Sequence, residues 1–269
     1  MAENKVILIL VAHADDTEFL AGGTIAKFAS QGWEIYEVIT TDNQRGSYEL
    51  DSETLIKQSE EEAKKAAEIL GKKHVVFLRY PDGMRSGYPL NELREKFIRL
   101  IRKYKPKIVF TFDPWAPFEP HPDHRMVAMA AVEAVSFAQN PKFHPEHFDE
   151  GLETHQVAEC YYFAKAPVYA DTVIDITDFI DKKVEALCAH DSQMKLTIDE
   201  MKLALEATGI APNLAKSLDR NNYRGVIDLM VKMYAEQVGK KAGYKYGEEF
   251  RYEIAGGEIV KAIKEMGFE

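Results

Sequence analysis

The stretch VILILVAHADDTEFLAGGT, residues 6–24, decides the fold that we expect for this chain. Val6 to Ala12 form an unbroken apolar run, the pattern of a strand that is buried on both faces of a parallel sheet. His13 and three carboxylates then follow within six residues. Carboxylates this close repel one another and resist burial unless a cation or fixed dipoles hold them. The stretch is therefore either a polar turn that caps the next helix or half of a metal site.

Apolar runs and amphipathic segments alternate through the first half of the chain. The expected strands span 6–12, 34–40, 74–78 and 107–112, and the expected helices between them span 23–32, 53–70 and 91–104. Strands that alternate with helices form βαβ units, which give a mostly parallel sheet with right-handed crossovers. VAECYYFA and DTVIDI indicate further strands, and the chain reads mainly helical from about residue 177. We therefore expect one α/β domain with a helical C-terminal part.

The composition disfavours several classes of partner. The chain has 269 residues, and 34 basic against 44 acidic residues give a formal net charge of −10. A protein that binds nucleic acid through phosphates needs a basic face, so we expect no nucleic-acid partner. No apolar run approaches the roughly 20 residues that span a bilayer, so we expect no membrane insertion. Cys160 and Cys188 form no CxxC pair and no secretion signal is visible, which indicates a cytoplasmic protein.

The loops that follow the strands are the expected place for a site. In an open parallel sheet, ligands bind beyond the carboxyl ends of the strands, near the point where the strand order reverses. The loops at 13–22, 41–52, 79–90 and 113–124 should gather at that edge. The last of them carries a second dense polar cluster, DPWAPFEPHPDHR. Two segments far apart in the sequence are therefore expected to form one site.

The residues in these two loops are those of a metal site with a free coordination position. His13 and Asp16 are three residues apart, and His121 and His124 repeat that spacing. One imidazole from the second pair would complete a set of two histidines and one carboxylate, which leaves a position for water, as catalytic zinc sites require. A metal lowers the pKa of such a water to about 7. The carboxylate and imidazole left over could then act as general base and general acid.

Two blocks, AHADDTEFLAGG and HPDHR, give the chain a resemblance to a known family. It resembles the PIG-L/LmbE-like family of metal-dependent N-deacetylases, and TTDNQRGS, EEEAKKAAEILG, FLRYPDG, VIDITDFIDKK and AHDSQ match weaker blocks in the family's usual order. The resemblance implies a Rossmann-like, mostly parallel sheet with helices on both faces. It also implies a single domain over residues 1–269, with a catalytic core at about 5–193 and a helical part at about 194–269.

The resemblance also implies an activity, which is removal of acetyl from N-acetylglucosamine-type substrates. By position, His13, Asp16 and His124 would bind the metal, Asp15 would be the general base, and His121 would protonate the product or stabilise the oxyanion. The metal is usually Zn²⁺ in this family, and two imidazoles with one carboxylate also suit Fe²⁺ or Co²⁺. The expected partners are a small amino-sugar substrate and further copies of the chain in a homo-oligomer.

Two positions depart from the family pattern. Ala14 replaces a proline, which loosens the turn but removes no ligand, and Ser59 stands where the family commonly has an arginine. The missing guanidinium puts the anchoring of the substrate in question. We expect Arg45 to take that role and Arg79 to have a smaller one, the alternative being that both are solvated loop charges.

Other residues have two interpretations each. Trp115 either lines a sugar pocket or fills a loop, and His190 and Gln193 in AHDSQ are candidates for closing the site. Gly22 and Gly23 indicate close packing or room for substrate rather than a dinucleotide loop, because G-x-G-x-x-G is absent. HPEH at 144–147 imitates the second motif but lies far from any expected strand end, which disfavours a second metal site there.

Three functions remain to be compared. The favoured one is a zinc-dependent N-deacetylase, a hydrolase that acts on an amino sugar or a sugar conjugate. The second is hydrolysis of another amide or an ester by the same metal site. The third is a non-catalytic sugar-binding protein on this fold, which the retention of candidate ligands, base and acid argues against.

Overall fold

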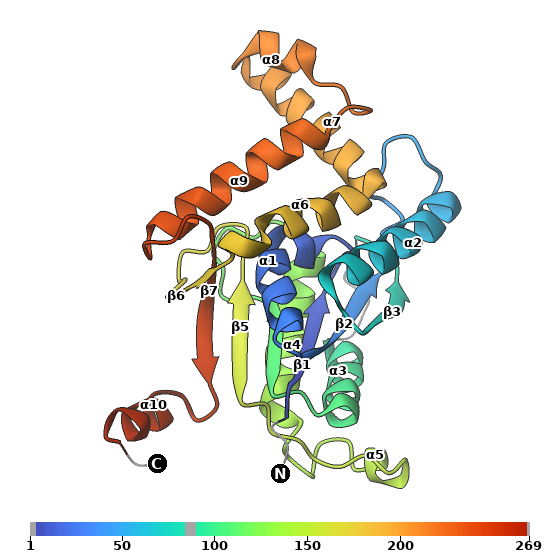
Figure 1. Ribbon diagram of the computed structural model, residues 1–269. Coiled ribbons are helices and arrows are strands. Elements are labelled where there is room, and N and C mark those ends of the chain that lie inside the picture. Colours follow the sequence, from blue (N-terminus) through green and yellow to red (C-terminus); the bar gives the residue numbers. More distant parts are fainter. Residues whose placement is uncertain (1–3, 84–89, 268–269) are drawn as a thin grey trace.

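The computed structural model describes residues 4–83 and 90–267 (Figure 1), so that residues 84–89 of the expected loop at 79–90 lie outside the described residues. The strands are β1 (Val6–Val11), β2 (Glu34–Thr41), β3 (His74–Tyr80), β4 (Ile108–Phe112), β5 (Glu159–Phe163), β6 (Thr172–Asp175) and β7 (Gly247–Ile254). The helices are α1 (Asp16–Ser30), α2 (Ser52–Leu70), α3 (Leu90–Tyr104), α4 (Pro122–Phe137), α5 (Glu146–Asp149), α6 (Ile180–Ala189), α7 (Asp191–Thr208), α8 (Pro212–Ser217), α9 (Arg224–Lys240) and α10 (Gly257–Glu265), with a 3₁₀ turn at Thr177–Phe179.

The strands of the described residues form one seven-stranded sheet in the order β3-β2-β1-β4-β5-β7-β6. The pairs from β3 across to β5 are parallel, whereas β7 is antiparallel to both β5 and β6. The order runs backwards from β1 to β3 and forwards from β4, so the reversal lies between β1 and β4. Ligands of such sheets bind at this reversal, beyond the carboxyl ends of the strands.

Helices cover both faces of the sheet, which confirms the expected α/β fold. Helices α1, α2 and α6 contact one another over one face, and α3 and α4 contact each other over the opposite face (Figure 1). Residues Ile7 to Ala12 are fully buried, as the unbroken apolar run at the start of the chain predicts. Among the described residues, no helix combines the length and apolarity that crossing a membrane requires.

The C-terminal part is not wholly helical. Helices α7, α8 and α9 agree with the expected helical part, but β7 returns to the sheet and inserts between β5 and β6. Phe250 of this strand is fully buried, and its ring packs edge-on against the rings of Phe110 and Tyr161. The short segment EEFRYEI carries too many charges for its alternation to identify a strand, and only the tertiary contacts of Phe250 select one.

The glycine pair of α1 serves close packing. A Cβ on Gly23 would lie 2.8 Å from side-chain atoms of Ile176, so any larger residue would push α1 away from its neighbour. In addition, the Glu248 carboxylate of β7 accepts hydrogen bonds from the amides of Gly23 and Thr24 at 3.0 and 2.7 Å. Lys183 of α6 donates to the same carboxylate at 2.6 Å. The last strand and α6 thus hold the helix that follows the HADD segment.

A buried ion cluster links the same helix to β2. The ammonium of Lys72 donates to one carboxylate oxygen of Glu18 and to one of Glu37, each at 2.7 Å, and all three side chains are fully buried. Glu18 is one of the three acids of the opening stretch, so its place in the fold is as a partner of Lys72. A buried charge that loses its partner is strongly destabilising.

We expect Lys72→Met to lower the free energy of unfolding by about 3–5 kcal/mol, because the change leaves two carboxylates buried without their cation. The neighbouring Lys73→Met is the matched control. Lys73 pairs with Glu34 at 2.7 Å, and both side chains are about half exposed, so its loss should change stability little. Urea unfolding followed by tryptophan fluorescence measures both. Equal small effects of the two substitutions would contradict the role given to Lys72.

Candidate metal centre

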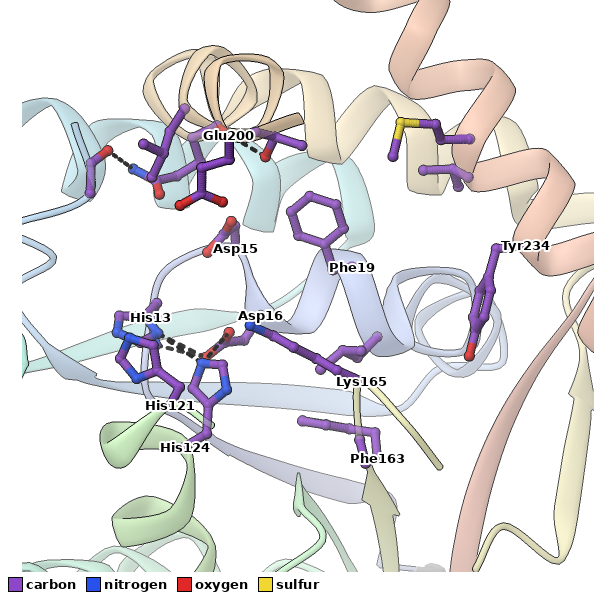
Figure 2. Close-up of a pocket in the computed structure, with 18 of the residues that line it drawn as sticks. His13, Asp15, Asp16, Phe19, His121, His124, Phe163, Lys165, Glu200 and Tyr234 are labelled. Carbon is purple, nitrogen blue, oxygen red and sulfur yellow. Dashed lines mark hydrogen bonds and ion pairs between the residues drawn. The ribbon is translucent and has the colours of Figure 1, made fainter. Parts of the chain in front are cut away.

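The expected site lies where β1 and β4 end. His13 follows β1, Asp16 is the first residue of α1, and His121 and His124 belong to the beginning of α4, which follows β4 (Figure 2). One oxygen of the Asp16 carboxylate accepts the amides of Ala12 and His13 at 3.1 and 2.7 Å. That oxygen closes the strand-to-helix turn, and the second oxygen points toward His124. The polar turn and the first half of the candidate metal site are therefore formed by the same residues.

One nitrogen of His13, one nitrogen of His124 and the two carboxylate oxygens of Asp16 converge here at the spacing of a single ion. His13 Nδ1 lies 3.1 Å from His124 Nε2, which lies 3.3 Å from Asp16 Oδ1, and His13 Nδ1 lies 3.7 Å from Asp16 Oδ2. Zinc bonds of about 2.0–2.1 Å in tetrahedral geometry separate two ligand atoms by roughly 3.3 Å. The donor set and its spacing therefore fit a divalent metal ion.

The outward nitrogens of both imidazoles face carboxylates. His124 Nδ1 lies 3.1 Å from Glu119 Oε1, and His13 Nε2 lies 3.3 Å from Asp82 Oδ1. Histidines that bind metals commonly present their other nitrogen to a carboxylate, which fixes the ring and its tautomer. The other nitrogen of each ring, His13 Nδ1 or His124 Nε2, therefore faces the space that the two rings share with Asp16.

An overlapping set of ligands exists on the other side of His13. His13, Asp82, His121 and Asp123 bring one ligand atom each within 4.8 Å of one another, as do His13, His121 and His124, whereas Asp16 belongs to neither of these groups. However, Asp123 accepts a hydrogen bond from the Gly83 amide at 2.7 Å, so one of its oxygens is engaged in holding the β3 loop. In the set of His13, Asp16 and His124, the outward nitrogens of both imidazoles face carboxylates. We therefore prefer this set, in which His121 is not a ligand.

Asp15 lies at the mouth of this arrangement. It precedes α1, its carboxylate caps no helix amide, and it lines the cavity next to Asp16 (Figure 2). Burial raises the pKa of the Asp15 carboxyl, and the charge of Asp16 adds to the rise. A carboxylate with a raised pKa beside a reaction centre is suited to accept a proton.

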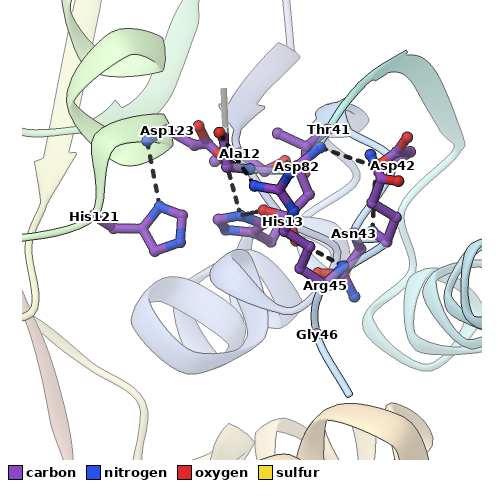
Figure 3. A network of polar contacts seen from close by, with 12 residues as sticks. Ala12, His13, Thr41, Asp42, Asn43, Arg45, Gly46, Asp82, His121 and Asp123 are labelled. Carbon is purple, nitrogen blue, oxygen red and sulfur yellow. Dashed lines mark hydrogen bonds and ion pairs between the residues drawn. The ribbon is translucent and has the colours of Figure 1, made fainter. Parts of the chain in front are cut away.

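His121 has a defined hydrogen-bonding role. It caps α4, with its Nδ1 accepting the Asp123 amide at 3.3 Å (Figure 3). Because Nδ1 accepts, the proton of the neutral ring is on Nε2, which can donate a hydrogen bond to a ligand. Burial, together with the rings of His13 and His124, lowers the pKa of His121 to about 4.

These residues border one cavity of about 680 Å³. Of the residues expected from the sequence, it is lined by His13, Asp15, Asp16, His121, His124 and Arg45. The Arg45 amide donates to Asp82 at 3.1 Å, and its guanidinium lies 3.5 Å from the Gly83 carbonyl (Figure 3). Asp82, which sits in an ordinary turn, therefore links His13 to the Arg45 loop.

Three expected residues lie away from the cavity lining. Arg79 is exposed and forms two hydrogen bonds with Glu60, at 2.6 and 3.0 Å. Trp115 is 58% exposed on the β4 loop. His190 is fully buried, with Nε2 3.6 Å from the Glu18 carboxylate. Arg79 therefore belongs to a surface ion pair, Trp115 is an exposed ring, and His190 is a histidine of the core.

The position of the missing family arginine is occupied by a supporting hydroxyl. Ser59 is buried and accepts a hydrogen bond from Asn43 at 3.1 Å, and Asn43 itself lines the cavity. Gln193 of α7 lines it too and donates to the Gly46 carbonyl at 3.0 Å. Gln193 is one of the two AHDSQ residues considered for closing the site. The partners of Gln193 and Ser59 could not be predicted from the sequence, because both contacts depend on how α7 and α2 pack against the β2 loop.

The HPEH segment is engaged in structural contacts. His144, Glu146 and His147 form a group that could hold an ion. Both nitrogens of His147 are already occupied, however, by Arg102 at 3.1 Å and Glu95 at 2.8 Å. The buried Arg102 guanidinium would also repel a cation placed here.

Comparisons with known proteins agree with this geometry. Residues 8–135 match the family model described as PIG-L: GlcNAc-PI de-N-acetylase. The chain is 35% identical over 201 residues to a diacetylchitobiose deacetylase of Thermococcus kodakarensis, which covers 73% of each protein. It is 29% identical to a 4-oxalmesaconate hydratase of Pseudomonas putida, over 75% of this chain and 79% of that protein.

A solved structure has the same fold over nearly the whole chain. The N,N'-diacetylchitobiose deacetylase of Pyrococcus horikoshii, complexed with its inhibitor MPG, superposes with a TM-score of 0.75. The match covers 93% of this chain and 84% of that one, at 28% sequence identity.

Proposed function

This chain belongs to the PIG-L family of deacetylases, and on that premise we propose that it is a metal-dependent hydrolase that removes acetyl from an N-acetylglucosamine-type amino sugar or sugar conjugate. The observation that carries the proposal is the set of His13, Asp16 and His124 atoms 3.1–3.7 Å apart at the edge of a cavity. A carboxylate and an imidazole outside that set, Asp15 and His121, border the same cavity.

In this proposal, His13, Asp16 and His124 hold the ion, with Zn²⁺ preferred and Fe²⁺ or Co²⁺ also suited to two imidazoles and a carboxylate. The ion, when bound, lowers the pKa of a water molecule and polarises the carbonyl of the amide. Glu119 and Asp82 orient the two imidazoles from behind.

Asp15 and His121 carry out the proton and charge steps. Asp15 accepts a proton from the attacking water, and its protonated form then supplies a proton to the nitrogen that leaves when the C–N bond breaks. His121 donates the Nε2 hydrogen to the oxygen that becomes negative during the attack. Water and the amide are converted to acetate and an ammonium group, since the second proton of the water passes from the carboxylic acid product to the released amine, so atoms and protons balance.

A panel of N-acetylated sugars, assayed for release of free amine with and without a chelator, tests the function. Amine release that the chelator abolishes and added Zn²⁺ restores is the expected result. If only esters or unrelated amides are hydrolysed, the result would favour the alternative function, which is hydrolysis of another amide or an ester by the same metal site. The relative named a hydratase makes hydration of an unsaturated acid a further assay, since one fold can serve several reactions.

The anchoring role of Arg45 gives a separate prediction. Arg45→Ala should raise KM about tenfold or more while kcat and metal content stay unchanged, because a charge-assisted hydrogen bond to the substrate is lost in ground and transition states alike. Arg79→Ala is the matched control, since its guanidinium is paired with Glu60 outside the cavity lining. Steady-state kinetics of both variants, with metal analysis, is the measurement. Normal kinetics in Arg45→Ala with a large defect in Arg79→Ala would reverse the assignment.

A further inference from the structure

The cavity has two ends of different chemistry. Beside the candidate metal ligands its lining is polar and includes Asn43, Arg45, Asp82 and Gln193. Away from them it extends between α1, α7 and α9 (Figure 2). We call this extension the apolar arm, and define it by Phe19, Leu196, Met230, Val231, Tyr234 and Ala235.

The cavity is larger than one amino sugar requires. Pockets that hold drug-sized ligands have volumes of roughly 300–1,000 Å³. A single N-acetylhexosamine is only about half the size of such a ligand. The volume of about 680 Å³ therefore leaves room for a second group after a sugar has filled the polar end. That second group would lie in the apolar arm.

The lining of the arm determines the chemistry of its occupant. Leucine, valine and methionine side chains offer no hydrogen bonds to sugar hydroxyls, and a buried hydroxyl without a partner costs free energy. Charges near the arm are of both signs: Lys165 and Glu200 line the cavity, Lys183 is paired with Glu248, and Glu249, which also lines the cavity, is paired with Lys241. This mixture gives no net preference for an anion or a cation. An uncharged apolar group is the chemistry that the arm accommodates.

The far end of the arm is open. Met230 and Tyr234, which border it on α9, are 40% and 48% exposed. An open end suits a substituent that projects away from the reacting amide. The acetyl group, by contrast, ends within a short distance of the reacting carbon.

We propose that the apolar arm binds an alkyl or aryl aglycone of the amino sugar, so that the preferred substrate is an N-acetylglucosaminide with an apolar aglycone rather than a second sugar. This inference rests on the proposed function. It adds α9 to the parts of the chain that determine specificity.

The test compares substrates that differ only in the aglycone. Between methyl and hexyl N-acetylglucosaminides we expect KM to fall at least about tenfold, since each fully buried methylene can contribute about threefold to fourfold. Hexyl chains are short enough to remain monomeric in solution. N,N'-diacetylchitobiose should have a higher KM than the hexyl glycoside. A lower KM for diacetylchitobiose would show that the arm holds a sugar and would overturn the proposal.

Two methionines of α9 form a matched pair of variants. Met230 lines the arm, whereas Met233 is 61% exposed and does not belong to the cavity lining. Met230→Ser should reduce the fall in KM between the methyl and hexyl glycosides by at least about half on a logarithmic scale. Met233→Ser should leave this fall in KM unchanged. Equal effects of both substitutions, or of neither, would overturn the assignment of the arm.

Calorimetric binding of methyl and hexyl glucosaminides, the deacetylated products, separates this inference from the proposed function. If no N-acetyl sugar is hydrolysed but the hexyl compound binds at least about tenfold more tightly through Met230, the function fails and the arm stands. If amine is released without any dependence on the aglycone, the function stands and this inference fails. A fall in KM that follows the length of the N-acyl chain, rather than the length of the aglycone, would also overturn the assignment of the arm.

Discussion

Replacing His124 with alanine should reduce the metal content of the purified protein from about one equivalent per chain to nearly none, and amine release with it. The His124 ring supplies Nε2 to the candidate site and is stacked on Phe112, with ring centroids 4.1 Å apart. Three protein ligands are the minimum of catalytic zinc sites, so two remaining ligands would hold the ion weakly. Elemental analysis after dialysis against trace metal measures the loss.

His121→Ala is the control for this experiment, because the two rings are stacked with centroids 4.6 Å apart and differ mainly in their partners. It should keep its metal and lose activity. Undiminished metal in His124→Ala together with loss in His121→Ala would assign the ion to the overlapping set that includes Asp82 and Asp123. Circular dichroism of both variants establishes that the fold is retained.

Asp15→Asn should lower kcat by about 10²- to 10⁴-fold while the metal content remains near one equivalent. The substitution keeps the size and shape of the side chain and removes only its ability to accept a proton. Asp16, the adjacent carboxylate, uses its oxygens for the turn and the candidate metal site, so it cannot take over the role. The measurement combines the rate of amine release with metal analysis of the same sample.

The informative comparison is Glu200→Gln, because Glu200 of α7 is a second carboxylate on the cavity wall near Asp15 (Figure 2). We expect a smaller loss of kcat from this change than from Asp15→Asn. The opposite ranking, with normal turnover in Asp15→Asn, would transfer the general-base role to Glu200.

The sequence was sufficient to predict the edge of the sheet at which the candidate site lies. Val6–Ala12 is fully apolar and KIVFTF is mostly apolar, so their strands could be identified as central, and both are followed by histidines and acids. Parallel strands bring such ends together regardless of the rest of the chain. The meeting of His13 and Asp16 with one imidazole of HPDH follows from this rule and from spacing, whereas the choice of His124 over His121 was implied by the family resemblance.

The outward partners of the imidazoles and the apolar arm could not be predicted in this way. In the sequence, Glu119 cannot be distinguished from other acidic residues in loops. Its contact with His124 depends on the path of the loop between β4 and α4. The arm depends on α1 and α9 lining the same cavity, which joins segments from opposite ends of the chain. Local periodicity contains no information about such contacts. Likewise, nothing local distinguishes the paired Arg79 from the cavity residue Arg45.

The position of β7 has a consequence for how the chain is made. Strand β5 ends at Phe163, but its neighbour in the sheet begins only at Gly247, and among the described strands β6 pairs with β7 alone. On the ribosome, β5 therefore stays an open edge until nearly the whole chain has been synthesised, and open edges pair readily with other chains. Glu248 reaches the amides of α1 at the same late moment. A nascent chain that stops before β7 is thus an aggregation-prone species, and the first helix to be synthesised is among the last to acquire its final support.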